Sequence, residues 1–169
     1  MDAKVIDCEI KQKRTNKKCA IRVLMAILGN HGKIENALNY CLCYALMAKR
    51  KNQALKNLFG QFLFEELKTL SDVYALSKNL GVEISAASLK QGVKQYRRKE
   101  MNTDQIIVDC IARELALAID IKKAIGAVRD QNAVRVLNSI LYESQRKTEI
   151  LYEKLAQIRS GYGKVPLGV

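Results

Sequence analysis

The sequence predicts an all-α protein whose main part is a bundle of four long helices. Apolar residues recur at helical spacing through four segments of the 169-residue chain. The chain has one proline, and so few prolines favour long uninterrupted helices. Hydrophobic residues make up 49% and charged residues 27% of the chain, which is typical of a single domain with a substantial core.

We expect a basic arm and a short helix over residues 1–30, before the bundle begins. The short helix is expected at 17–28, closed by Gly29. The stretch KQKRTNKK followed by CAIRVLMAIL has the order of a signal peptide, but Arg22 interrupts the apolar run and no small-x-small cleavage site follows. No segment approaches about 18 consecutive apolar residues, so we expect no transmembrane helix.

The first two bundle helices are predicted at residues 33–50 and 54–80, joined by a short turn. Gly81 ends the second of them. The inward stripe of the first helix is predicted to be Ile34, Ala37, Leu38, Cys41, Ala45 and Ala48. The stripe of the second is predicted to be Leu55, Phe59, Phe62, Glu66, Leu70, Val73, Ser77 and Leu80, and Leu63 and Leu67 also fit a buried face.

The last two bundle helices are predicted at residues 103–129 and 131–159, with Thr103 or Asp104 as the N-cap of the first. Their stripes are predicted to be Ile107, Cys110, Glu114, Leu117, Ile121, Ile125 and Val128, and Leu137, Leu141, Ser144, Thr148, Leu151, Leu155 and Ile158. The short connections imply antiparallel neighbours, whereas residues 81–102 form a long crossover. The bundle domain is thus expected at 31–159, followed by an extended tail at 160–169.

Two glutamates, Glu66 and Glu114, fall inside apolar stripes. A carboxylate that is buried alone is costly, so each must be paired, protonated or bound to a ligand. Facing glutamates, with Glu-x-x-His motifs on two of the helices, are the way in which di-iron four-helix bundles build their metal site.

At these residues the chain resembles the ferritin-like superfamily, most closely bacterioferritin and rubrerythrin, over about residues 33–158. The segments that carry the resemblance are NLFGQFLFEELKTLSDVY, ARELALAIDIKKAIGAV and RVLNSILYESQRKTEILYEKL, and Tyr40 falls where the family carries a tyrosine. The resemblance implies a ferritin-like bundle with a long crossover between its second and third helices. The family's six metal ligands fall on Lys33, Glu66, Thr69, Glu114, Ser144 and Lys147.

Only the two glutamates keep the residue type of a ligand, so we expect no cofactor, with iron or manganese as the alternative. We predict that Glu66 and Glu114 form an internal ion pair or hydrogen-bonded group with partners among Lys33, Lys147, Tyr40 and Tyr44. The alternative for Lys33 is that it faces water at the start of its helix. The alternative for Lys147 is that it faces water because Thr148 fits the stripe better. Glu65 is expected to be solvated.

The formal net charge of +12 favours an anionic partner, either an acidic protein or a nucleic acid. Candidate anion-binding residues lie in the turn after residue 48 and in the crossover. They are Lys49, Arg50, Lys51, Lys94, Arg97, Arg98 and Lys99. The alternative is that these are solvated charges, because no nucleic-acid-binding motif accompanies them.

The five cysteines are Cys8, Cys19, Cys41, Cys43 and Cys110. Their spacing suits neither a zinc site nor a disulfide framework, because no C-x-x-C pair is present and the number is odd. We expect buried, reduced thiols in a cytoplasmic protein.

These observations favour a non-catalytic ferritin-like protein that has lost its di-iron site and acts as a structural or binding module with a basic surface. A homo-oligomer is one candidate for its assembly. One alternative is a metal-binding protein of the iron-storage or oxidoreductase type, with a site built from Glu66, Glu114 and either Glu35 or Glu143. A second alternative, based on charge, is a nucleic-acid-binding protein.

Overall fold

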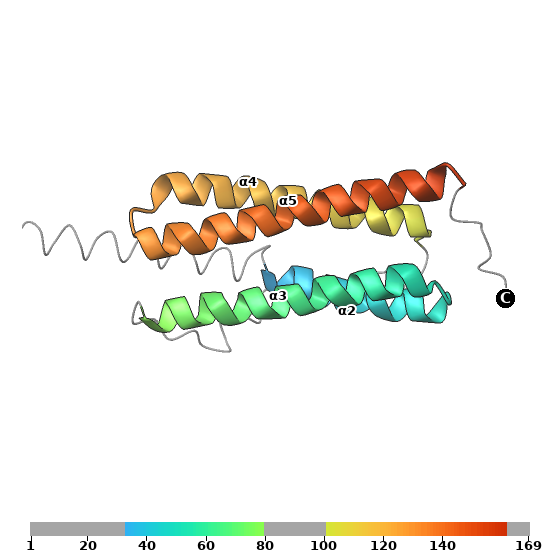
Figure 1. Cartoon of the computed structure of the whole chain (residues 1–169), viewed down its shortest axis with the longest axis horizontal. Helices are drawn as coiled ribbons and strands as arrows, with labels where there is room; N and C mark the ends of the chain where they lie inside the picture. The colour runs from blue at the N-terminus through green and yellow to red at the C-terminus, as the bar shows by residue number, and fades with distance from the viewer. Residues whose placement is uncertain (1–32, 80–100, 162–169) are drawn as a thin grey trace, which may run out of the picture.

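The computed structural model describes residues 33–79 and 101–161, which fold into four α-helices and contain no strand (Figure 1). The prediction of an all-α protein is confirmed, and each helix begins and ends within two residues of its predicted bounds. The predicted N-terminal arm and short helix, Gly81, nearly all of the crossover and the end of the tail lie outside the described residues. The helices are α2 (Lys33–Lys49), α3 (Gln53–Asn79), α4 (Thr103–Ala127) and α5 (Gln131–Arg159).

The four helices are arranged as two helical hairpins, α2 with α3 and α4 with α5 (Figure 1). The side chain of Arg50 joins the two hairpins at one end of the bundle. Arg50 lies in the turn after α2 and donates to the Thr103 hydroxyl at 3.2 Å and to the Met101 carbonyl. At the same end, within the second hairpin, Arg159 of α5 pairs with Asp104 of α4 at 3.4 Å. Because α3 and α4 both start at this end of the bundle, they run in the same direction.

Side-chain caps set the ends of the helices, and one predicted cap is wrong. The N-cap of α4 is Asn102, not Thr103 or Asp104. The Asn102 side chain accepts from the Gln105 amide at 2.8 Å, and the Gln105 side chain accepts from the Asn102 amide at 2.9 Å. This reciprocal pair satisfies two backbone donors, whereas Thr103 already belongs to the first turn. Asp130 caps α5 with a single contact, in which its side chain accepts from the Ala133 amide at 2.8 Å.

The interior contains two apolar clusters, one toward each end of the bundle. The first draws on all four helices and consists of Tyr40, Cys43, Met47, Leu55, Phe59, Phe62, Ile106, Ile107, Cys110, Ile111, Leu151 and Leu155. The second draws on α3, α4, α5 and the α4–α5 turn, and consists of Val73, Leu117, Ile121, Ala124, Val128, Ala133, Leu137 and Ile140. Between them lie the buried polar residues, so the two apolar clusters are separated by a polar layer.

The predicted stripes of α3, α4 and α5 face inward at every described position, but the stripe of α2 is largely wrong. Leu38, Cys41, Ala45 and Ala48 are exposed, and so is Leu67 on α3. The inward face of α2 is instead made of Lys33, Asn36, Ala37, Asn39, Tyr40, Cys43 and Met47. Most faces of this helix carry apolar residues, so its spacing alone did not distinguish the face that packs against the bundle.

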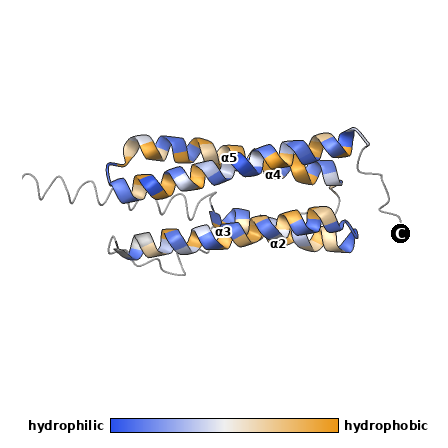
Figure 2. Cartoon of the chain, viewed as in Figure 1, coloured by the Kyte–Doolittle hydropathy of each residue, from blue (hydrophilic) through white to orange (hydrophobic). Residues whose placement is uncertain are grey.

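Figure 2 shows hydrophobic and hydrophilic residues mixed along every helix. In the two described ranges, no helix has an apolar stretch long enough to cross a lipid bilayer.

Two phenylalanines on α3 test the assignment of the core. Phe62 is fully buried and contacts the Tyr40 ring, whereas Phe64 is 71% exposed. We expect Phe62→Ala to lower the free energy of unfolding by about 3–5 kcal/mol, because it leaves a cavity in a close-packed cluster. The matched variant Phe64→Ala should change it by about 0.5 kcal/mol or less. Denaturant unfolding followed by circular dichroism measures both, and equal losses would contradict this arrangement of α3.

Candidate functional site: a buried charged layer

The polar layer between the two apolar clusters contains five ionisable side chains, which we call the charged layer. Four of them have no exposed surface, and the fifth, Glu143, is 16% exposed. Burying a charge is costly unless it is paired and hydrogen-bonded, so the contacts within the layer decide whether the fold can hold it. The charged layer consists of Lys33, Glu66, Glu114, Glu143 and Lys147.

Helical spacing places these side chains at one level of the bundle. Glu66 follows the core residue Phe62 by four positions, and Glu114 follows Cys110 by four, so each lies one turn beyond an apolar residue on the same face. On α5, Glu143 and Lys147 are also four positions apart and pair directly at 3.2 Å. Lys33, the first residue of α2, supplies the remaining ammonium group.

Glu66 lies between two ammonium groups. Lys33 Nζ is 3.0 Å from one of its carboxylate oxygens, and Lys147 Nζ is 2.5 Å from the other. The contact with Lys147 is also a hydrogen bond. The contact with Lys33 is an ion pair without hydrogen-bond geometry, so that Glu66 oxygen has no aligned donor among the described residues.

Glu143 bridges the same two lysines from α5. One oxygen accepts from Lys33 Nζ at 3.0 Å and from the Thr69 hydroxyl at 2.7 Å. The other is 3.2 Å from Lys147 Nζ. Glu66, Glu143 and the two lysines therefore form a four-membered charge cluster that joins α2, α3 and α5.

Glu114 is held differently, by neutral groups. One oxygen accepts from the Tyr40 hydroxyl at 2.6 Å and from the Asn36 amide at 3.2 Å. The other lies 2.6 Å from Ser144 Oγ, which is also 2.9 Å from the Glu114 backbone carbonyl. The single hydroxyl proton of Ser144 can serve only one of these two acceptors. A neutral Glu114 that donates its own proton to Ser144 satisfies both contacts.

The pKa values of the layer follow from burial and from these neighbours. Burial, followed by the charge of Glu66, raises the pKa of Glu114 above its ordinary value. Burial alone would raise the pKa of Glu143, but the charges of Lys33 and Lys147 outweigh it and lower that pKa. Burial alone would lower the pKa of Lys33, but the charges of Glu66, Glu143 and Glu114 raise it. Two ammonium groups thus face two carboxylates, and the third carboxyl favours its proton.

Tyr40 connects the charged layer to the first apolar cluster. Its ring lies against Phe62, with centroids 5.3 Å apart, while its hydroxyl reaches Glu114. Lys147 Nζ lies 5.6 Å from the centroid of the Tyr40 ring, so the ammonium group also faces an aromatic surface. Burial and the neighbouring Glu114 raise the pKa of Tyr40 well above its ordinary value, which keeps the hydroxyl a donor.

The structure brings Lys33, Lys147 and Tyr40 to the two predicted glutamates, but it leaves Tyr44 outside the layer. Tyr44 is 38% exposed, and its ring lies against Lys56. The alternatives in which Lys33 and Lys147 face water are wrong, because both side chains are fully buried. Thr148 is buried as well, since α5 faces more than one neighbouring helix.

The expectation that Glu65 is solvated is also wrong. Its side chain is 22% exposed, and it pairs with Arg146 at 2.5 Å across α3 and α5. Because Lys147 Nζ lies 3.9 Å from Glu65 Oε2, the pair of Glu65 and Arg146 lies directly beside the charged layer.

The anion-binding candidates are only partly described. Lys49, Arg50 and Lys51 are exposed at the α2–α3 turn, where Arg50 is used to join the two hairpins. The other candidates, Lys94, Arg97, Arg98 and Lys99, lie outside the described residues.

The charged layer does not fit the di-iron site that the family resemblance implies. Both carboxylate oxygens of Glu66, one of the six implied ligands, contact lysine ammonium groups, and so do both oxygens of Glu143 beside it. Within residues 33–79 and 101–161, no cluster of three or more His, Cys, Asp or Glu side chains has an arrangement that could hold a metal ion. Glu35, named in the metal-binding alternative, pairs with Arg113 at 3.8 Å.

Comparison with known proteins adds no family: neither a protein-family model nor a curated protein sequence matches this chain.

Sequence reasoning missed three members of the site or gave them no role in it. Asn36 and Thr69 donate to Glu114 and Glu143, and Glu143 itself was assigned only to the metal-binding alternative. A signal for Glu143 was present, because it lies four positions before Lys147 and next to the inward Ser144. Asn36 had no comparable signal, since the inward face of α2 was assigned to other residues.

Removing one cation from the charged layer should be strongly destabilising. We expect Lys147→Met to lower the free energy of unfolding by about 3–5 kcal/mol, because it leaves Glu66 and Glu143 with too little positive charge in the interior. The double variant Lys147→Met/Glu66→Gln should lose less than the single variant, since it removes a charge of each sign. Lys123→Met, at a side chain that is 75% exposed, is the matched control. Urea unfolding of the four proteins measures this, and equal losses in the single and double variants would contradict the pairing.

Glu143 should stabilise the protein more at neutral pH than in acid. Its folded-state pKa lies below its ordinary value of 4.5, so its stabilising effect is complete above that value and is lost as the pH falls through the folded-state pKa. The difference in unfolding free energy between the unmodified protein and Glu143→Gln should therefore shrink below about pH 4.5. Denaturant titrations between pH 7 and pH 3 measure it, and a constant difference would count against the two lysine contacts.

Glu114 should show the opposite dependence on pH. Its folded-state pKa lies above its ordinary value of 4.5, so the folded state holds the proton more tightly than the unfolded state. The unmodified protein should thus lose stability relative to Glu114→Gln as the pH rises from about 4.5 through the raised folded-state pKa of Glu114. The same titrations, carried upward from pH 4, measure this difference, and a rise in place of a fall would show that Glu114 is held as a carboxylate.

Proposed function

We propose that this protein is a ferritin-like four-helix bundle whose interior site holds two lysine ammonium groups in place of two metal ions, and that it acts as a non-catalytic structural or binding module. The observation that carries the proposal is the position of Lys33 and Lys147. Both ammonium groups are fully buried and contact the carboxylates of Glu66 and Glu143.

The residues of the charged layer support this reading of the ancestral site. In the family resemblance, Lys33 stands at a glutamate position and Lys147 at a histidine position, so a negative and a neutral ligand are each replaced by a cation. Loss of a di-metal centre removes about four positive charges, and two ammonium groups with fewer carboxylates restore the balance. Thr69, at the other histidine position, donates to Glu143 and so also serves the ion-pair cluster.

The direction of the helices supports the ferritin-like connection. Because α3 and α4 start at the same end of the bundle, the end of α3 and the start of α4 lie at opposite ends, which is the arrangement that a ferritin-like connection requires. The interior pairing also favours a structural role, since the lone pairs of Glu66 and Glu143 that could bind a substrate or a metal ion are already directed at lysines.

The binding part of the proposal rests on charge. The net charge of +12 favours an anionic partner, for which we propose an acidic protein surface. Lys49 and Lys51 are exposed beside each other at the α2–α3 turn and are available for such a contact.

Metal content tests the central claim. We expect the protein, purified without chelators, to contain well under one iron or manganese ion per chain by elemental mass spectrometry. A variant that restores the four altered ligands should gain metal, because hard oxygen and imidazole ligands would then replace the cations. The four substitutions are Lys33→Glu, Thr69→His, Ser144→Glu and Lys147→His.

Two controls complete this experiment. Circular dichroism should show that the four-substitution variant remains helical, and Lys147→Met should remain metal-free because it removes a cation without adding a ligand. Stoichiometric iron or manganese in the unmodified protein would overturn the proposal and favour the metal-binding alternative.

A further inference from the structure

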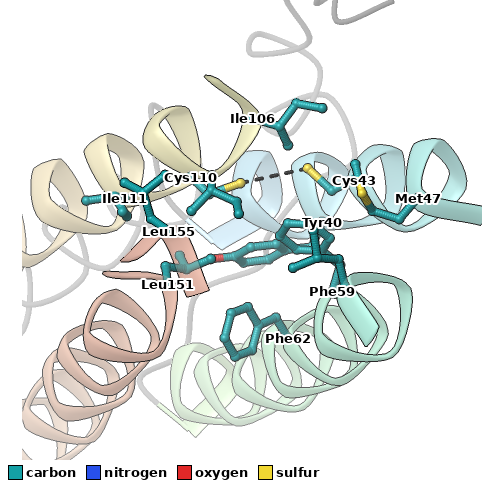
Figure 3. Packing of buried hydrophobic residues seen from close by; sticks show 12 residues of the cluster. Tyr40, Cys43, Met47, Phe59, Phe62, Ile106, Cys110, Ile111, Leu151 and Leu155 are labelled. Carbon is teal, nitrogen blue, oxygen red and sulfur yellow. Dashed lines mark hydrogen bonds between the residues drawn. The ribbon is translucent and has the colours of Figure 1, made fainter. Parts of the chain in front are cut away.

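Two cysteines from different hairpins meet inside the first apolar cluster. Cys43 on α2 and Cys110 on α4 have no exposed surface, and their sulfur atoms are 3.8 Å apart. Figure 3 shows the two side chains pointing toward each other, with Ile106 and Met47 nearby. Both are thiols in this structure, although they lie close enough that one can donate a hydrogen bond to the other.

The Cys110 thiol has a polar neighbour. The buried Asn39 amide donates to the Cys110 sulfur at 3.4 Å. A donor directed at sulfur stabilises negative charge on it, so we assign Cys110 as the sulfur that reacts as a thiolate. Cys43 faces the Cys110 sulfur from α2 and is positioned to react second.

We propose that Cys43 and Cys110 are a redox-active pair that a small hydroperoxide converts into a disulfide between α2 and α4. The Cys110 thiol gives up its proton, and its sulfur attacks one oxygen of hydrogen peroxide. The O–O bond breaks, and the second oxygen leaves as water after taking up that proton, so Cys110 becomes a sulfenic acid. The Cys43 sulfur then attacks the Cys110 sulfur, the S–O bond breaks, and a second water leaves with the Cys43 proton. In total, two thiols and one peroxide give one disulfide and two waters.

The geometry permits this bond with small movements. The sulfur atoms need to approach from 3.8 Å to about 2.05 Å, which rotation of the two side chains and slight shifts of α2 and α4 can provide. Because both sulfurs are buried, the oxidant must be as small as hydrogen peroxide to reach them. The bond would join residues 67 positions apart and lock the two hairpins together.

Cys41 provides an internal comparison. It lies on α2 only two positions from Cys43, but it is exposed. If exposure alone decided which thiol is oxidised, Cys41 would react first. The short distance between the two sulfur atoms instead favours oxidation of Cys43 and Cys110.

The test uses the full-length chain with Cys8, Cys19 and Cys41 changed to serine, so that only the buried pair remains. Hydrogen peroxide should remove two hydrogen atoms from the intact mass, and peptide mapping without reduction should recover a peptide containing both Cys43 and Cys110. The oxidised protein should melt roughly 10 °C or more above the reduced protein, because the bond closes a long loop. Circular dichroism before oxidation confirms that the variant is folded.

Single replacements in the same background separate the two roles. Cys43→Ser should accumulate one added oxygen on Cys110, because no second thiol resolves the sulfenic acid. Cys110→Ser should leave Cys43 unoxidised over the same time. Equal oxidation of the two single variants would overturn the assignment of Cys110 as the attacking sulfur.

Other outcomes would overturn the proposed pair itself. These are an unchanged mass in the pair-only variant under conditions that oxidise Cys41 in the unmodified protein, disulfides between two chains, or independent oxidation of each sulfur.

Discussion

The interaction on which the rest of the structure depends is the pairing of two buried ammonium groups with the buried carboxylate of Glu66 and the partly buried carboxylate of Glu143 at the middle of the bundle. A charge buried without a partner would cost several kcal/mol, which is comparable to the whole stability of a domain. Lys33 and Lys147 each contact both Glu66 and Glu143, so the charge of each lysine is balanced by two carboxylates. The third carboxyl, Glu114, avoids the cost in another way, because its raised pKa favours the neutral form.

This layer also sets how the helices can pack. Apolar contacts alone allow one helix to slide or rotate against another with modest loss, whereas directed ion pairs are satisfied at one register. Because the charged layer draws residues from all four helices, it relates the two hairpins to each other at the level between the two apolar clusters. The same register places Cys43 opposite Cys110, which lies one turn before Glu114 on α4. The dithiol and the ion pairs are therefore consequences of one arrangement.

Much of the fold was predictable from spacing alone. The stripes of α3, α4 and α5 alternate clearly with polar residues, so their inward faces were identified correctly, with Glu66 and Glu114 among them. The stripe of α2 was not, because apolar residues such as Leu38 and Leu42 also lie on its exposed side. That helix turns toward the bundle the face that carries Tyr40, whose hydroxyl satisfies Glu114. The buried Glu114 needs a hydrogen-bond donor, and this need, more than the hydrophobic pattern of α2, explains which face of the helix turns inward.

The sequence by itself determined where the four helices lie and that the carboxyl groups of Glu66 and Glu114 would be buried and would need partners. These features depend on local periodicity and on the cost of burying charge, both of which can be read along one chain. Only the tertiary structure decided the partners: both lysines to Glu66 and Glu143, and Tyr40 and Ser144 to Glu114. The physical reason is that all of these contacts except Lys147–Glu143 join side chains 30 to 110 positions apart on different helices, and their geometry exists only once the four helices pack together.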